Sequence, residues 1–325
     1  MNDEITNDER FLEISCWLAL PYLPGIGRRT IHSIAARNCA LDIPITRFFE
    51  MEKSDLLARY DLPAGAELEL ASRKRALELA KGITSRALRA GVSVLTIADE
   101  TYPVGLLDSL KDDAPHILYL KGDTTLLDRP GIAVVGTRTP SRKAKRAAAL
   151  CAGKIAAEGF NLVSGYALGI DTCAHTAALE NGGTTTMILP HGILRFRRKP
   201  GFPECRVCEE RALVLSEFAP DSPFSRHTAL TRNRTICGLA GAVLVVETEK
   251  KGGAVNAGRN ALRLRKPLFV AAAETSRSTP AGNRLLIDEG AKPIGIFGTD
   301  REPDLTPLFD AARSPYKPPQ LKLEL

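Results

Sequence analysis

Gly131-Ile-Ala-Val-Val-Gly136 decides the fold, because it is a short, uninterrupted apolar run that ends in glycine. A helix pattern follows it from about Ser141 to Glu158. A buried strand that passes through a glycine turn into a helix is typical of parallel sheets covered by helices on both faces. The sequence therefore predicts an α/β fold built outward from this strand.

The same alternation of strand and helix continues along the chain. Further apolar runs of strand length are Phe160–Ser164, Thr184–Leu189, Ala212–Ser216, Ala242–Glu247 and Pro267–Ala271, with a helix near Thr172–Asn181. Two shorter strand candidates, Val92–Ile97 and His116–Leu120, lie ahead of the main sheet. We expect a Rossmann-like, doubly wound, mostly parallel sheet over residues 91–300.

The segments before and after residues 91–300 lack this alternation of strand and helix. Residues 1–90 carry apolar side chains at three- and four-residue spacing around a Leu23-Pro-Gly-Ile-Gly27 turn, which predicts a small helical domain. This domain resembles SAM or helix-hairpin-helix domains. Residues 301–325 contain prolines at Pro303, Pro307 and Pro315, and we expect a loosely packed, Pro-rich tail without a winged helix.

Composition excludes several classes of protein. The 325 residues are 44% hydrophobic and 25% charged, which is ordinary for a globular protein and not for a disordered one. The formal net charge of +6 permits a nucleic-acid partner without requiring one. We find no apolar stretch of membrane-spanning or signal-peptide length, and the seven scattered cysteines do not suggest a disulfide framework. We expect a cytoplasmic protein without membrane contact.

In an open parallel sheet, ligands bind outside the carboxyl ends of the strands, so the turns there are the candidate site. In the first turn, Gly136 allows close backbone approach, Thr137 and Ser141 offer hydroxyls, and Arg138 offers a guanidinium that suits phosphate. The adjoining helix start carries four cations with no acid between them, Arg142, Lys143, Lys145 and Arg146. The turn lacks the spacing of a dinucleotide-binding loop.

A second turn, after Phe160–Ser164, offers donors to another phosphate from Ser164, Gly165 and Gly169. We expect Asp171 to cap the following helix through its carboxylate, and His175 to be structural.

Two further basic segments complete the predicted edge. Arg232, Asn233 and Arg234 belong to a basic loop ahead of an apolar helix at Thr235–Ala240, with the two arginines on opposite sides. The other segment runs through Arg195, Arg197, Arg198 and Lys199, and Lys250 follows a later strand. Several cationic sites on one edge fit a polyanion better than a mononucleotide. Tyr166 and Phe224 are the candidates for base stacking, and a merely solvated basic edge remains the open alternative.

Signs of catalysis are few. Glu247 is the one candidate general base, and no nucleophile or metal triad accompanies it. Cys205 and Cys208 form a single CxxC pair, which we interpret as ordinary thiols. We therefore predict no catalytic residue, no metal and no cofactor.

Together these motifs resemble the DprA/Smf DNA-processing family. The resemblance covers nearly all of residues 14–297, and its motifs follow the family order. They are Gly136-Thr-Arg138-Thr-Pro-Ser141, Ser164-Gly165-Tyr-Ala-Leu-Gly169-Ile-Asp171 through His175, Leu215–Phe218, Arg232-Asn-Arg234, Val245–Glu247 and Gly282-Asn-Arg284.

The resemblance implies a single-stranded DNA-binding protein that forms a homodimer through its Rossmann-like domain. Such proteins protect incoming DNA and load the RecA recombinase during natural transformation, without catalytic turnover. The positions that correspond to DNA-contacting residues are Arg138, Ser164, Gly165 and Arg232. The turn before Arg28 resembles a helix-hairpin-helix, so Gly25, Gly27 and Arg28 would form a secondary DNA-binding site unless the turn is a plain connector.

Two segments depart from the family pattern. Pro190–Phe196 replaces an expected G-x-G-x-D-x-x-Y-P stretch, and Lys250–Asn256 replaces a glycine-serine loop. These departures leave two other functions open. One is a nucleotide-binding sensor or nucleotide-processing enzyme on the same edge, and the other is a scaffold whose basic edge binds an acidic protein surface.

Overall fold

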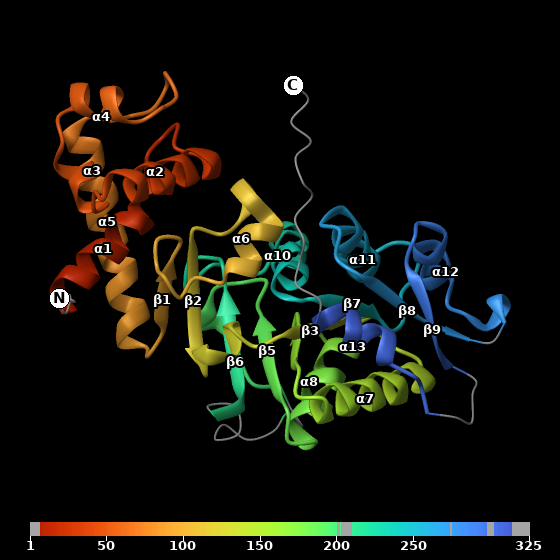
Figure 1. Ribbon diagram of the computed structural model, residues 1–325. Helices are drawn as coiled ribbons and strands as arrows, with labels where there is room; N and C mark the ends of the chain where they lie inside the picture. Colours follow the sequence, from red (N-terminus) through yellow and green to blue (C-terminus); the bar gives the residue numbers. More distant parts are fainter. Residues whose placement is uncertain (1–6, 200–201, 203–209, 274, 298–301, 314–325) are drawn as a thin grey trace, which may run out of the picture.

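A computed structural model describes residues 7–199, 202, 210–273, 275–297 and 302–313. One nine-stranded sheet runs through it in the order β1-β2-β6-β5-β4-β3-β7-β8-β9. The strands are β1 (Ser93–Thr96), β2 (Ile117–Gly122), β3 (Gly131–Val135), β4 (Asn161–Ser164), β5 (Thr184–Ile188), β6 (Ala212–Ser216), β7 (Ala242–Val245), β8 (Leu268–Ala273) and β9 (Lys292–Phe297). Figure 1 shows this sheet crossing the molecule from β1 to β9.

The strands from β3 to β9 are parallel to one another, which confirms the prediction of a mostly parallel sheet. Strand order reverses at β3, because β4, β5 and β6 lie on one side of it and β7, β8 and β9 on the other. The turns after β3 and β7 therefore lead to helices on opposite faces, and this opens a crevice at the carboxyl ends of the two strands.

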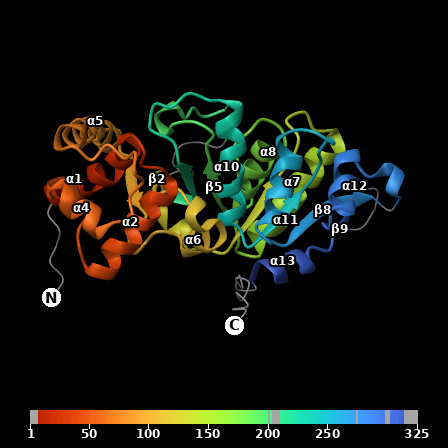
Figure 2. The ribbon, with the colours of Figure 1, turned by 90° about the horizontal axis from the view of Figure 1, so that it is seen from above.

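Helices cover both faces of the sheet, which confirms the doubly wound α/β class. One apolar core joins the sheet to α7 (Arg142–Ala157), α8 (Ile170–Glu180) and α13 (Thr306–Arg313). A second core joins the other face to α6 (Val104–Leu110), α10 (Arg226–Leu239), α11 (Gly253–Arg263) and α12 (Ala281–Asp288). Figure 1 shows α10 and α11 on the opposite side of the sheet from α7 and α8, and Figure 2 looks onto the side that carries α10 and α11.

The described residues before β1 are mainly helical. They form α1 (Asn7–Ala19), α2 (Arg28–Leu41), α3 (Thr46–Glu50), α4 (Lys53–Arg59) and α5 (Leu70–Arg89), with a short 3-10 turn at Leu20–Tyr22. Their core is centred on Trp17 and Phe48 and continues into Tyr119 of β2 and Val214 of β6. The helical part therefore packs against the β1–β2 end of the sheet.

Four details differ from the sequence predictions. β1 and β2 do not precede the main sheet but extend it, because β2 pairs antiparallel with β6. β9 was not predicted, since an edge strand with Lys292 and Pro293 exposed has no continuous apolar run. α10 begins at Arg226 instead of Thr235, where Ser225 and Thr228 form a capping box. Finally, part of the predicted loose tail forms α13.

α13 packs because its apolar residues recur at helical spacing. Leu308 is fully buried, and the ring of Phe309 stacks on that of Phe160 with 5.6 Å between centroids. The prolines that suggested a loose tail precede or start the helix: Pro303 lies before it, and Pro307 lies in its first turn, where proline is tolerated. Residues 314–325, with Pro315, lie outside the described residues.

We predict that Leu308→Ala lowers the free energy of unfolding by about 2–5 kcal/mol, because it leaves a cavity in a closed core. Urea unfolding measures the change, and Thr306→Ala at an exposed position of the same helix is the matched control. Equal stability of Leu308→Ala and the control would show that this segment is not part of the core.

Candidate functional site

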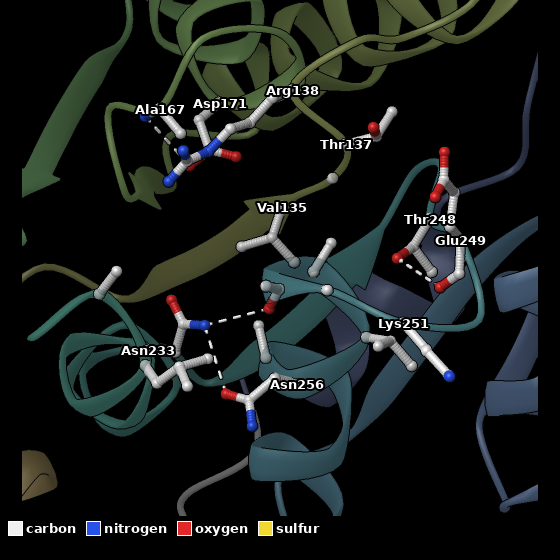
Figure 3. A pocket seen from close by; sticks show the side chains of 18 of the residues that line it. Val135, Thr137, Arg138, Ala167, Asp171, Asn233, Thr248, Glu249, Lys251 and Asn256 are labelled. Atoms are coloured by element: carbon white, nitrogen blue, oxygen red, sulfur yellow. Dashed lines mark hydrogen bonds between the residues drawn. The ribbon is translucent and has the colours of Figure 1, made fainter. Parts of the chain in front are cut away.

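A pocket of about 890 Å³ lies at the strand-order reversal between β3 and β7. The turn after β3, the turn before α11 and one side of α10 line it, as Figure 3 shows for Arg138, Asn233 and Lys251. Six of the predicted site residues meet here: Gly136, Thr137, Arg138, Arg232, Asn233 and Lys250. Because they come from three separate turns and helices, only the fold brings them together.

Glycines allow the turn after β3 to pack on the start of α8. A Cβ atom on Gly136 would lie 2.5 Å from Ile170, and one on Gly169 would lie 2.3 Å from the carbonyl oxygen of Thr137. Gly169 also has a φ of 90°, which favours glycine. Gly169 therefore shapes the pocket wall from behind and is not among the lining residues.

Ser141 is the N-cap of α7. Its hydroxyl accepts a hydrogen bond from the Ala144 amide at 3.1 Å, and its own amide donates to Glu247 Oε2 at 2.8 Å. A carboxylate is favourable at a helix N-terminus. The candidate general base is thus already engaged with the helix, and Ser141 lines only a smaller neighbouring cavity.

Arg232 is a buried cation of the pocket wall. It is 4% exposed on α10, and its Nη1 donates to the carbonyl oxygen of Ile188 at 2.6 Å. Its Nε has no hydrogen-bond partner among the described residues. Burial lowers the pKa of Arg232 to about 10, and the Asp171 carboxylate opposes this shift. The guanidinium therefore stays charged at neutral pH.

The turn after β4 holds this guanidinium in place. A Cβ atom on Gly165 would lie 1.8 Å from Nη1 of Arg232, so only glycine leaves room for the arginine. Asp171 accepts the amides of Gly165 at 3.2 Å and Ala167 at 3.3 Å, and burial raises its pKa against the effect of Arg232. The expectation that Asp171 caps α8 was wrong, because Gly169 is the N-cap.

Ser164, His175 and Tyr166 are internal. The Ser164 hydroxyl donates to the Val134 carbonyl at 2.5 Å, and His175 Nε2 accepts the Tyr166 amide at 3.3 Å. Tyr166 is buried, with the Phe202 ring 5.1 Å away and Lys199 Nζ 4.0 Å from its own ring centre. Neither the Ser164 hydroxyl nor the Tyr166 ring is presented to the pocket.

Phe224, the other candidate for base stacking, does face the pocket. It lines the pocket and is 49% exposed, and its ring centre lies 5.7 Å from the Arg138 guanidinium carbon. This contact holds an arginine and an aromatic face next to each other at the pocket mouth.

Apart from Lys250, the turn from β7 into α11 is a part of the site that the sequence analysis treated only as a departure. Asn233 Nδ2 donates to the Gly253 carbonyl at 3.1 Å and thereby fixes this turn from α10. Gly252, with a φ of 128°, is the N-cap and carries no side chain, while Lys250 and Lys251 are exposed beside it. The pattern that could have identified this turn from the sequence is the Gly252-Gly253 pair between a strand and a helix.

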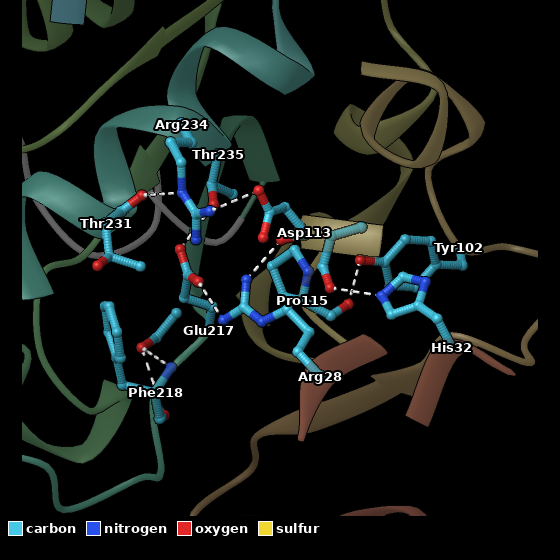
Figure 4. A network of polar contacts seen from close by, with 12 residues as sticks. Arg28, His32, Tyr102, Asp113, Pro115, Glu217, Phe218, Thr231, Arg234 and Thr235 are labelled. Carbon is cyan, nitrogen blue, oxygen red and sulfur yellow. Dashed lines mark hydrogen bonds and ion pairs between the residues drawn. The ribbon is translucent and has the colours of Figure 1, made fainter. Parts of the chain in front are cut away.

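Arg28 and Arg234 lie elsewhere, at the junction between the helical part and the sheet (Figure 4). Arg28 donates to the Asp113 carbonyl at 2.5 Å and lies 3.6 Å from Glu217, whereas Arg234 lies 3.4 Å from the Asp113 carboxylate. Neither lines the pocket. Gly25 and Gly27 are exposed in the turn before Arg28 and do not line the pocket either.

Remaining expectations concern the segment after β5 and metal binding. Arg195 donates to the Asp221 carbonyl at 2.6 Å, and Arg197 to the Leu194 carbonyl at 3.0 Å. Cys205 and Cys208 lie outside the described residues. Within the described ranges, His, Cys, Asp and Glu form no group of three that suits a metal ion. None of the described helices has the length and apolar character that crossing a membrane requires.

Comparison with known proteins connects this geometry to one family. The model of a family described as DNA recombination-mediator protein A matches residues 93–299. DNA processing protein DprA of Streptococcus pneumoniae is 34% identical over 200 residues, which are 61% of this chain and 70% of that protein. DprA of Bacillus subtilis is 29% identical over 205 residues, which are 63% of this chain and 68% of that protein.

Two solved structures are similar over much of the chain. The X-ray structure of DprA from Streptococcus pneumoniae superposes with a TM-score of 0.68 at 27% identity, covering 90% of this chain and 95% of that one. A structure of DNA processing protein A from Helicobacter pylori, reported for its single-stranded DNA binding mode, has a TM-score of 0.54 at 31% identity and covers 64% and 91%.

We predict that stability falls between pH 7 and pH 5 through the buried His175. Burial lowers the pKa of His175 from 6.5 to about 3, so the unfolded state takes up a proton in this window and the folded state does not. The free energy of unfolding should fall by about 2 kcal/mol more in the native protein than in His175→Gln. Urea unfolding at both pH values measures this, and parallel pH dependence of the two proteins would contradict it.

Proposed function

This chain belongs to the DNA recombination-mediator protein A family, and on that premise we propose that its pocket binds single-stranded DNA. The backbone of an unpaired strand would lie along the pocket between β3 and β7. Gly136, Thr137, Arg138, Arg232 and Lys250 would contact phosphates, while Asn233 would hold the turn before α11.

The observation that carries the proposal is the excess of positive charge in one pocket. Its basic lining residues are Arg138, Arg226, Arg232, Lys250, Lys251 and Arg259, against the acidic Asp171 and Glu249. Asp171 accepts the amides of its own turn and interacts electrostatically with the buried Arg232. Separate cations along a pocket suit a chain of phosphates, and each neutralised phosphate adds a salt-dependent increment to affinity.

Apolar side chains support the preference for an unpaired strand. Phe224 and Leu230 are both partly exposed within the pocket, and Phe224 lies beside Arg138. Bases of a single strand have open faces that can stack on such a surface, whereas bases in a duplex do not. The Helicobacter pylori relative, reported for its single-stranded DNA binding mode, agrees with this preference.

We extend the proposal to the protein's cellular role. The bound strand would be protected and then transferred to the RecA recombinase during natural transformation, by a homodimer formed through the Rossmann-like part. Binding requires no chemical turnover. The engagement of Glu247 with the Ser141 amide supports this, because the one candidate base already has an internal partner.

We predict that Arg138→Ala and Arg232→Ala each weaken binding of labelled oligothymidine about tenfold, because each removes a phosphate contact. Arg234→Ala is the matched control, since it removes an arginine two residues from Arg232 that does not line the pocket. Fluorescence anisotropy across a salt series measures affinity, and each pocket variant should have a salt slope shallower by about 0.7.

Unchanged affinity in both pocket variants, or tighter binding of duplex than of oligothymidine, would contradict this assignment. Release of base or phosphate from nucleotides by the pure protein would instead support a nucleotide-processing enzyme.

We also predict that Gly165→Ala weakens oligothymidine binding about as much as Arg232→Ala does. The added methyl group would occupy the place of Nη1 of Arg232 and displace the guanidinium without removing its charge. Anisotropy gives the affinity, and circular dichroism checks that the variant is folded. A folded Gly165→Ala with native affinity would show that the position of Arg232 is unimportant.

A further inference from the structure

The first turns of α7 carry a cluster of cations that the pocket does not include. This α7 basic patch consists of Arg142, Lys143, Lys145 and Arg146, all of which are exposed. The opposite side of the same helix is buried through alanines such as Ala144 and Ala148. At 100° per residue, Arg142, Lys145 and Arg146 point to the same solvent-facing side.

Within the described residues, no ion pair neutralises the patch. The ion pairs of this region lie at the other end of the helix, where Lys154 contacts Glu302 at 2.7 Å and Glu158 contacts Arg313 at 2.6 Å. The first turn of α7 contains no acidic residue. The carboxylate that does reach the helix start, Glu247, is bound to the Ser141 amide.

This placement is electrostatically unfavourable in the free protein. The N-terminus of a helix carries a partial positive charge, which repels cations in the first turns. Arg142 also faces Lys145 and Arg146 at spacings of three and four residues, where like charges destabilise a helix. A bound polyanion would reverse both effects, whereas folding of the chain alone gains nothing from them.

The patch continues the surface of the pocket. Arg142 follows Arg138 by four residues, and the intervening Thr139 lines the pocket. A smaller cavity of about 400 Å³ shares Thr137, Thr139 and Lys250 with the pocket and extends to Ser141, the N-cap of α7. Glu249 lies at this boundary and is exposed and acidic. It interrupts the positive charge of the pocket, which begins again at the start of α7.

We propose that the α7 basic patch binds the part of the DNA strand that continues out of the pocket. This inference rests on the proposed function and extends it, because it makes the binding site longer than the pocket itself. Phosphates of the flanking nucleotides would lie along the exposed face of Arg142, Lys145 and Arg146. Strands too short to leave the pocket would not reach them.

The test compares two strand lengths in one variant. Arg142→Gln, Lys145→Gln and Arg146→Gln are combined, and anisotropy is measured with oligothymidines of about 6 and about 20 nucleotides, which bracket common site sizes. We expect about tenfold weaker binding of the long strand, with a salt slope shallower by about 2, and unchanged binding of the short strand. Lys74→Gln with Arg75→Gln, at exposed positions of α5, is the control and should alter neither affinity.

Thermal unfolding supplies a second readout. The triple variant should have an equal or higher Tm, because it removes repulsion from the free protein. A lower Tm would overturn the inference by showing that the cations stabilise the fold.

The remaining outcomes separate this inference from the proposed function. Native affinity of the variant for the long strand would overturn the inference and leave the patch to another partner, such as an acidic protein surface. Equal loss at both lengths would also overturn it, because the patch would then belong to the pocket. Failure of the native protein to bind either oligothymidine would instead overturn the proposed function.

Discussion

The buried guanidinium of Arg232 is the interaction on which the site depends. A charge that is only 4% exposed is stable in a protein when its surroundings compensate it, and here the Ile188 carbonyl and the Asp171 carboxylate do so. Asp171 in turn holds the amides of the turn after β4, and Gly165 leaves the space that the guanidinium fills. Gly165, Asp171 and Arg232, which belong to three separate sequence motifs or turns, thus form one unit around one cation.

The same region links the pocket to the helical part of the protein. Glu217, whose side chain is 1% exposed, accepts the Thr235 hydroxyl at 2.6 Å and lies 3.6 Å from Arg28 of α2. It also acts electrostatically on Arg232. α10 therefore has two roles: Arg232 faces the pocket, and Arg234 contacts Asp113 at the junction with the helical part.

The basic residues have two different roles, which depend on where each side chain lies in the fold. Arginines with internal partners, such as Arg28 and Arg234, bind the two parts of the chain together. Arg138, Lys250 and Lys251 at the pocket and the cations on the start of α7 are exposed, so packing does not explain them and phosphate would, whereas Arg232 is buried in the pocket wall. The distinction rests on what surrounds each side chain, because arginine has the same intrinsic charge at every position.

The sequence alone determined the α/β class, the order of the parallel strands along the chain and the first turn with Gly136 and Arg138, because apolar runs and glycine turns are local patterns. It did not reveal that Ser164 and Tyr166 are internal, that Glu247 serves α7, or which of Arg232 and Arg234 turns away from the pocket. Those roles were decided by the tertiary structure, since hydrogen-bond partners such as Val134 and Ser141 come from distant strands and turns. The sequence gives the functional groups of each residue. Whether their polar atoms are free to bind a ligand depends on which neighbours the fold places within hydrogen-bonding distance.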